Sequence, residues 1–213
     1  MLSRWLLLGL LSIGWVSTAQ ATVDQSNPYS MVEEVAAVLL SHYRSEQELL
    51  QREPQQLRPL VEEHLMPYVN HTYASYKVMG KAVRKASPEQ RQRFTDEFRQ
   101  YMIGIFANAF TIYTDQTISY EPKKPLGDRG IVNVGVTFDD GKRAPIEVKF
   151  KMRLNKKSGQ WQAIDLIAEG ASILAAKESE FDGLIRKQGL DEVINMLAEK
   201  NRQAVQPAEA PAS

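Results

Sequence analysis

Cysteine is absent from this 213-residue chain, and histidine occurs only three times. Without thiolates the fold can contain neither disulfide bonds nor cysteine-based zinc sites. The histidines, His42, His64 and His71, are spread over stretches of helical pattern and show no HxxxH or HExxH spacing. We therefore expect no metal, no catalytic cofactor, and a core held together by side-chain packing alone.

An excess of charge of one sign is also missing. Lys and Arg total 26 residues, Asp and Glu total 26, and the formal net charge is zero. A nucleic-acid-binding domain normally carries a basic excess, so nucleic acid is not an expected partner. The chain also lacks a P-loop, a nucleophile elbow and a dinucleotide-binding glycine pattern, which removes the commonest enzyme signatures.

Long apolar runs are absent except at the N-terminus. Arg4 precedes an apolar run from Trp5 to Val16, and the segment closes on Ala19-Gln20-Ala21, a small-x-small pattern. The run is too short to span a bilayer comfortably. We predict a signal peptide over residues 1–21, cleaved after Ala21, and therefore a location outside the cytoplasm. An uncleaved N-terminal anchor helix is the alternative.

The remaining chain divides into three parts by hydrophobic periodicity. Helical patterns occupy about residues 28–113, alternating patterns about 117–168, and helical patterns again about 172–202. This order predicts an α+β fold in a single domain over 22–202. Residues 203–213, rich in alanine and proline, are expected to form a disordered tail.

One long helix is predicted strongly. Ser87-Pro88-Glu89-Gln90 has the form of a capping box with proline in the first turn. Behind it, apolar residues recur on one helix face to about Tyr113. They are Phe94, Phe98, Tyr101, Met102, Ile105, Phe106, Ala109, Phe110 and Tyr113.

The alternating region predicts an antiparallel meander with one dry and one wet face. The dry face is expected to carry Val132, Val134, Val136, Phe138, Ile146, Val148, Phe150, Met152 and Leu154. Charged residues, among them Lys149, Lys151 and Arg153, alternate with them on the other face. Asp139-Asp140-Gly141-Lys142 is typical of a hairpin turn, which explains its two carboxylates without catalysis.

Asp165 differs from the other carboxylates because it lies inside an apolar strand pattern. A buried carboxylate needs a partner, so we expect it to pair with a cation or to cap nearby backbone. The alternative is a general base in a pocket. His64 and His71 are expected to be surface or capping residues.

Apolar surface is plentiful, since the dry sheet face, the long helix and a segment with Tyr73 and Tyr76 all supply it. A curved sheet wrapped by helices can leave a pocket at its concave face. Periodicity alone leaves two alternatives open, a filled core or an apolar ligand cavity.

Several segments resemble the MlaC (toluene-tolerance) family of periplasmic phospholipid-binding proteins. They include Asp24-Gln25-Ser26-Asn27-Pro28-Tyr29, Leu65-Met66-Pro67-Tyr68-Val69 and Pro125-Leu126-Gly127-Asp128. The stretch from Trp161 to Ser172 is similar to the family pattern W-x-A-Y-D-M-I-A-E-G-V-S, with Ile164 in place of the aromatic residue and Ala171 in place of valine. The resemblance covers about residues 24–197.

The resemblance implies a nuclear-transport-factor-like α+β unit joined to a helical subdomain, with a curved sheet wrapped by helices and an apolar cavity between the sheet and the helices. It implies a carrier of phospholipid that maintains outer-membrane lipid asymmetry. The implied partners are an inner-membrane ABC transporter with an MCE-domain subunit and an outer-membrane lipoprotein–porin complex. We expect the cargo to be a diacyl phospholipid and the protein to be a monomer that is not an enzyme.

The residues expected to contact the acyl chains come from the long helix and the dry sheet face, with four weaker candidates outside them. They are Phe98, Met102, Ile105, Phe106, Val134, Val136, Val148, Phe150 and Met152, with Tyr73, Tyr76, Ile164 and Leu166 as the weaker ones. Two other functions stay open: an α+β cone-fold enzyme with Asp165 as base, and an envelope chaperone or scaffold that binds protein through its apolar stripe.

Overall fold

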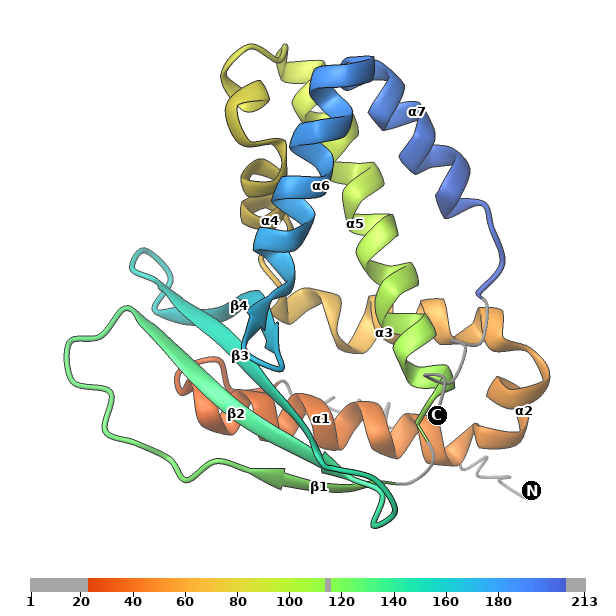
Figure 1. Cartoon of the computed structure of the whole chain (residues 1–213). Coiled ribbons are helices and arrows are strands. Elements are labelled where there is room, and N and C mark those ends of the chain that lie inside the picture. Colours follow the sequence, from red (N-terminus) through yellow and green to blue (C-terminus); the bar gives the residue numbers. More distant parts are fainter. Residues whose placement is uncertain (1–22, 114–115, 206–213) are drawn as a thin grey trace, which may run out of the picture.

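The computed structural model describes residues 23–113 and 116–205 (Figure 1). The expected signal peptide, Met1 to Ala21, therefore lies outside the described residues. The helices are α1 (Pro28–Ser45), α2 (Gln47–Arg52), α3 (Leu57–His64), α4 (His71–Met79), α5 (Pro88–Thr111), α6 (Ile173–Gln188) and α7 (Leu190–Asn201). The strands are β1 (Thr117–Tyr120), β2 (Ile131–Asp139), β3 (Ile146–Asn155), β4 (Gln160–Ala168) and β5 (Ala171–Ser172). No helix within these two ranges is long and apolar enough to cross a membrane.

Local sequence chemistry sets the start of the long helix α5. The Ser87 hydroxyl accepts a hydrogen bond from the Gln90 backbone N–H (3.1 Å), and the Gln90 side chain accepts one from the Ser87 N–H (3.0 Å). These bonds satisfy N–H groups that the first turn leaves unpaired. The predicted capping box is confirmed, although the helix ends at Thr111 rather than at Tyr113.

The strands form one antiparallel sheet in the order β1-β2-β3-β4-β5, which confirms the predicted meander. Neighbouring strands are consecutive in the chain, so the sheet contains no crossover connection. The β3–β4 pairing shifts at Lys151/Met152, where Lys151 lies opposite Asp165 and Met152 opposite Ala163. Ile164 is the extra residue of this β-bulge, which locally bends a strand and increases its twist.

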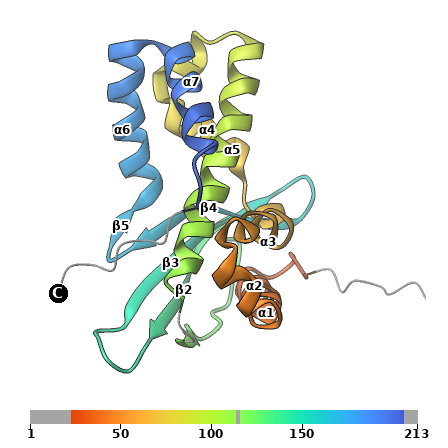
Figure 2. The same ribbon diagram turned by 90° about the vertical axis from the view of Figure 1, so that its right-hand side faces the viewer.

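The molecule has two blocks, visible in Figures 1 and 2. In both views α4, α6 and α7 stand at the top of the molecule and form the helical block. The sheet lies below them together with α1 and α3, and α5 reaches from the top down to the level of α3. Each block has its own core. The sheet-side cluster consists of Tyr29, Met31, Val32, Val35, Leu39, Tyr43, Leu50, Leu57, Leu60, Val61, Met66, Val69, Ile103, Ala107, Val132, Val134, Val136, Met152, Trp161 and Val205. The helical cluster consists of Ala74, Val78, Met79, Phe94, Phe98, Tyr101, Phe181, Val193, Ile194 and Leu197.

Met102 and Val205 are among the residues that link the blocks. Met102 of α5 packs against both clusters, so the helix is a shared wall. Val205 follows α7 of the helical block but is buried in the sheet-side cluster. The chain therefore continues to pack beyond residue 202, where we expected the tail to begin, and residues 206–213 lie outside the described part.

Candidate functional site

The inner face of the sheet is built by cross-strand pairs. In the β2–β3 register Val132 lies opposite Met152, Val134 opposite Phe150 and Val136 opposite Val148. Directly opposed residues of an antiparallel pair point to the same face, so these side chains form one apolar surface. The three β2 residues Val132, Val134 and Val136 are buried, while Val148 and Phe150 on β3 are half-buried.

Helices α1 and α5 supply the opposite side of this surface. The buried residues of α1 recur at helical spacing, as Val32, Val35 and Leu39 show. The C-terminal half of α5 contributes the buried Ile103 and Ala107 to the same cluster. Apolar faces of α1 and α5 therefore pack against the inner face of the sheet.

Large apolar side chains surround the sheet-side cluster without being fully covered. These half-buried residues include Tyr68, Met102, Phe106, Phe110, Tyr113, Ile118, Tyr120, Phe138, Val148, Phe150 and Leu154. We call this set the half-buried rim. The helical cluster also has half-buried neighbours, such as Leu174, Leu184 and Met196, but the rim differs from them in its aromatic rings. A large, partly exposed apolar surface typically marks a binding site.

A groove runs beside the rim, between α1 and β1. Its volume is about 650 Å³, and it is lined by Ala37, Leu40, Ser41, Arg44, Gln116, Thr117, Ile118 and Tyr120. Two of these, Ile118 and Tyr120, also belong to the half-buried rim, so the groove adjoins the sheet-side cluster. It is open to solvent and carries polar residues such as Ser41 and Arg44. The enclosed apolar cavity expected from the sequence stays a prediction.

The structure brings together most of the residues predicted to contact lipid. Seven of them lie in the sheet-side cluster or on its rim: Met102, Phe106, Val134, Val136, Val148, Phe150 and Met152. Leu166 lies opposite Phe150 in the β3–β4 register, so it points to the same face of the sheet. These eight residues from four elements form the candidate site.

The other predicted residues lie elsewhere. Phe98 is buried in the helical cluster. Ile105 and Tyr76 are exposed, at 37% and 42%. The Arg153 guanidinium carbon lies 5.3 Å from the centroid of the Tyr73 ring. Arg153 follows Met152 in β3, so its side chain lies on the outer face of the sheet, opposite to the face of Met152. Ile164 is buried at the bulge, outside both clusters.

Sequence reasoning missed the part of the wall that comes from α1 and α3. Tyr29, Val35 and Leu39 of α1 and Leu60 and Val61 of α3 belong to the same cluster as the sheet residues. Their helical periodicity was visible in the sequence, but it does not indicate which sheet face the helix covers. Pairing of a helix stripe with a sheet face is decided only by the tertiary fold.

Asp165 has a structural role. Its Oδ2 accepts a hydrogen bond from the Ser172 hydroxyl (2.7 Å) and its Oδ1 one from the Leu174 backbone N–H (3.0 Å). Ser172 is itself the N-cap of α6, accepting from the Ala175 N–H (2.9 Å). Both carboxylate oxygens are thus used to fix the start of α6, as expected for a capping role.

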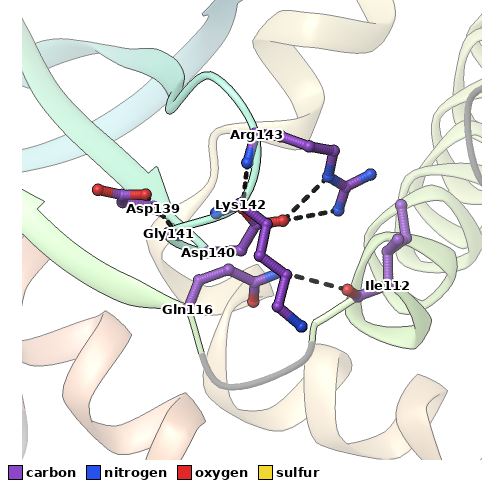
Figure 3. A network of polar contacts seen from close by, with 7 residues as sticks. All are labelled: Ile112, Gln116, Asp139, Asp140, Gly141, Lys142 and Arg143. Atoms are coloured by element: carbon purple, nitrogen blue, oxygen red, sulfur yellow. Dashed lines mark hydrogen bonds and ion pairs between the residues drawn. The ribbon is translucent and has the colours of Figure 1, made fainter. Parts of the chain in front are cut away.

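The adjacent carboxylates Asp139 and Asp140 organise the β2–β3 turn (Figure 3). Asp140 accepts hydrogen bonds from the backbone N–H groups of Lys142 and Arg143 and from the Arg143 guanidinium, each at 2.9 Å. These bonds, the backbone ones first, lower the pKa of Asp140 to about 2. The interpretation of Asp139 and Asp140 as turn residues is confirmed. A carboxyl group with a pKa of about 2 is ionised throughout the neutral pH range, so Asp140 is a poor general acid or base there.

The rings of His42 and His64 stack, with centroids 4.1 Å apart and planes 13° from parallel. Burial lowers the pKa of His64 below its ordinary 6.5, and the neighbouring His42 lowers it further. Glu63 and Glu46 act in the opposite direction but do not cancel the shift. Burial also lowers the pKa of His71. Within residues 23–113 and 116–205, no group of three or more His, Asp or Glu side chains is placed to hold a metal ion.

Comparisons with known proteins agree with this geometry. The chain is 30% identical over 205 residues to the intermembrane phospholipid transport system binding protein MlaC of Haemophilus influenzae, covering 96% of each. It is 28% identical over 192 residues to the toluene tolerance protein ttg2D of Pseudomonas putida, covering 88% of this chain and 87% of that protein. Both relatives are named for tolerance, binding or transport and not for an enzymatic reaction.

The fold is also shared with a solved structure. The phospholipid-binding protein from Ralstonia solanacearum, in complex with a phospholipid, matches with a TM-score of 0.74 at 22% identity, covering 84% of this chain and 99% of that one. A family model described as MlaC protein matches residues 33–199. That match spans most of the sequence and confirms the predicted resemblance, and the chain therefore belongs to the MlaC family.

Proposed function

We propose that this protein is a periplasmic phospholipid carrier, which shelters acyl chains against the inner sheet face and moves phospholipid between the outer and inner membranes to maintain outer-membrane lipid asymmetry. The observation that carries the proposal is the half-buried rim, an apolar surface from α5, β1, β2 and β3 that the protein leaves incompletely covered. The relatives' names, which describe phospholipid transport and toluene tolerance, support it.

The physical chemistry of the cargo explains why such a surface is needed. Exposing one CH₂ group to water costs about 0.8 kcal/mol, so two acyl chains cost on the order of 20–25 kcal/mol. Spontaneous desorption into water is correspondingly slow. Apolar side chains that are only half-buried, such as Phe106 and Phe150, offer contacts to acyl chains without first breaking a packed core.

The proposed cellular setting follows from the same chemistry. We propose that residues 1–21 are a signal peptide removed after Ala21 and that the mature chain is a single lipid-binding domain. Because opening in water exposes the tails, loading and unloading take place while the protein is docked. The proposed docking partners are an inner-membrane ABC transporter with an MCE-domain subunit and an outer-membrane lipoprotein–porin complex.

The test is lipid content. The full-length chain is expressed with its own signal, purified from the periplasm, and extracted for lipid mass spectrometry. We expect about one diacyl phospholipid per chain, because a protein of this size normally has a single ligand site and both tails of one lipid would share it. An empty protein that also takes no lipid from vesicles contradicts the carrier function, and co-purifying peptide instead of lipid favours the chaperone alternative.

A further inference from the structure

The outer face of the sheet, opposite to the candidate lipid site, is basic along β3. Lys149, Lys151 and Arg153 alternate with inward-facing residues, so their side chains share the outer face of the strand. Lys149 and Arg153 are exposed, and Lys151 is half-buried. Lys156 and Lys157, both exposed, continue the series into the β3–β4 turn. We call these five residues the basic row.

The basic row is not neutralised by its own stretch of sequence. Residues 148–164 contain these five basic side chains and no Asp or Glu, although the formal net charge of the whole chain is zero. Among the residues that the structure describes, no member of the row forms an ion pair with a carboxylate. Positive charge is therefore concentrated on one part of an otherwise balanced surface.

The carboxylates on or beside this face are engaged elsewhere or lie towards its other end. Asp165 is opposite Lys151, but its oxygens fix the start of α6. Glu121 donates no charge to the row either, since it pairs with the lysine three positions further along its own loop. Glu147 and Asp139 lie towards the β2–β3 turn, at the opposite end of the sheet from the β3–β4 turn.

Aromatic and apolar groups border the row at Arg153. The N-cap residue of α4 donates its backbone N–H to the Ala163 carbonyl (2.9 Å), which places the start of α4 beside this part of the sheet (Figure 1). The Arg153 guanidinium lies over the Tyr73 ring, and Tyr76, three residues further along α4, is exposed. Ile131 of β2, opposite Arg153, is 50% exposed.

This composition indicates the kind of partner. Four of the five cations are lysines, which are depleted at specific protein–protein interfaces, where arginine is enriched. The row lies on an open strand face and not in a pocket, so it suits an extended anionic surface better than a small anion. Tyrosine rings are amphipathic and favour the boundary between water and lipid.

We propose that the basic row, together with Tyr73 and Tyr76, forms a docking surface for a lipid bilayer that contains anionic phospholipid. The ammonium and guanidinium groups lie among the anionic head groups, while the tyrosine rings contact the interfacial layer. Attraction of this kind acts over about one Debye length and needs no shaped site.

Docking holds the protein at a membrane surface without inserting it. On β3 the inward-facing Phe150 and Met152 belong to the candidate lipid site, so one strand carries cargo contacts on one face and membrane contacts on the other. A carrier held in this way searches for its exchange partners in two dimensions. That use in lipid delivery rests on the proposed function, whereas attachment to the bilayer does not.

The experiment is co-sedimentation of the full chain, purified from the periplasm, with vesicles. One set contains phosphatidylcholine alone, and the other contains equal parts of phosphatidylcholine and phosphatidylglycerol with the same acyl chains. We expect binding to the anionic vesicles to be about tenfold tighter or more, and to weaken as sodium chloride rises from about 0.1 M to about 0.5 M. Because the acyl chains are identical, uptake of lipid into the candidate site does not produce this difference.

Equal binding to the two vesicle sets, or binding to neither, overturns the proposal. Failure to bind anionic vesicles leaves an acidic protein face as the occupant of the basic row.

The triple variant K149Q/K156Q/K157Q locates the surface. These three lysines are exposed and their side chains form no ion pair within the described residues, so the variant should fold. Each basic residue near an anionic surface strengthens binding about fivefold, so the loss should be on the order of 100-fold.

The matched control R186Q/K187Q/K200Q removes the same charge from exposed positions on α6 and α7. It should bind anionic vesicles within about twofold of the natural chain, since these residues lie away from the basic row. Equal loss in the two triple variants contradicts the assigned surface, because only net charge would then matter.

Y76S removes an exposed ring without changing charge, and should weaken binding to anionic vesicles about threefold. Unchanged binding of Y76S removes the tyrosine from the surface. The lipid content of K149Q/K156Q/K157Q purified from the periplasm should equal that of the natural chain. Failure of the docking surface and failure of the carrier function are therefore distinguishable.

Discussion

In the helical cluster the large aromatic side chains meet one another. Phe94 and Phe98 stack with ring centroids 5.8 Å apart, and the Phe181 ring stands edge-on to both, at 6.0 and 5.9 Å. In the sheet-side cluster the buried Tyr43 ring contacts Phe110 and Tyr113, at 6.0 and 5.3 Å, but those two rings, like Phe106 and Phe150, are only half-buried.

Both regions use the same helix, α5. Its N-terminal half places Phe94 and Phe98 among the buried residues of the helical cluster, while its C-terminal half places Phe106 and Phe110 on the half-buried rim. One continuous apolar stripe therefore serves two purposes. The comparison teaches that apolar periodicity identifies a face that will be covered but does not distinguish side chains that become fully buried from those that stay half-buried.

The largest expected change in stability comes from truncating a buried ring of the helical cluster. F181A removes a ring that contacts Phe94, Phe98 and Tyr101, and should lower the free energy of unfolding by about 3–5 kcal/mol. Denaturant unfolding with intrinsic fluorescence measures the change. The lipid content per folded chain should stay near that of the natural protein, and a loss of lipid would mean that the helical cluster also forms part of the site.

Overpacking the rim should separate binding from stability. F106W and V148W add volume where the side chains are half-buried, so the stability cost should be smaller than the about 1–3 kcal/mol typical of overpacked cores. The added ring fills space that acyl chains need, so lipid content should fall by roughly half or more. Mass spectrometry of extracted lipid gives the stoichiometry.

The control for these variants is F94W, which overpacks the helical cluster. Phe94 is fully buried, so this change should destabilise the protein more than F106W does and leave the bound lipid unchanged. Unchanged lipid content in folded F106W and V148W would remove these two residues from the site.

D165N tests the enzyme alternative and should lower the stability of the protein less than F181A does. Asparagine keeps one acceptor oxygen but loses the charge at the N-terminus of α6, which should cost about 0.5–2 kcal/mol. A carrier keeps its lipid after this change, whereas an enzyme that uses Asp165 as base loses turnover. S172A, which removes the partner hydroxyl, is the matched control for helix capping.

A modest pH dependence should come from the stacked histidines. The pKa of His64 is lowered in the folded state, so the neutral ring is favoured there. The contribution of His64 to stability is therefore full above the unfolded pKa of about 6.5 and declines as the pH falls from there towards the folded pKa. Unfolding midpoints between pH 8 and pH 5 should show a smaller decline in H64Q. An identical pH profile for both proteins would contradict the assignment.

The smallest effect is expected at the β2–β3 turn. The pKa of Asp140 is lowered to about 2, so its contribution exists above the unfolded pKa and is lost as the pH falls through about 2. A carboxyl titration by NMR should show the low pKa, and R143Q should raise it by removing one donor. Lipid content should not respond to either change, because the turn is on the exposed hairpin.

The sequence determined the local structure of this protein because local structure depends on near neighbours. The capping box at Ser87 and Gln90, the two-residue alternation of β2 and β3 and the turn at Asp139 to Lys142 each act within a few residues. The α+β order followed from them, and motifs such as Trp161 to Ser172 indicated the family.

Only the tertiary structure decided which apolar residues share a site. The bulge at Ile164, the cation–π contact of Arg153 with Tyr73 and the assignment of Phe98 to the helical cluster depend on residues far apart in the chain. Burial is a property of the assembled layers, so a periodic stripe cannot reveal what will cover it or whether anything will.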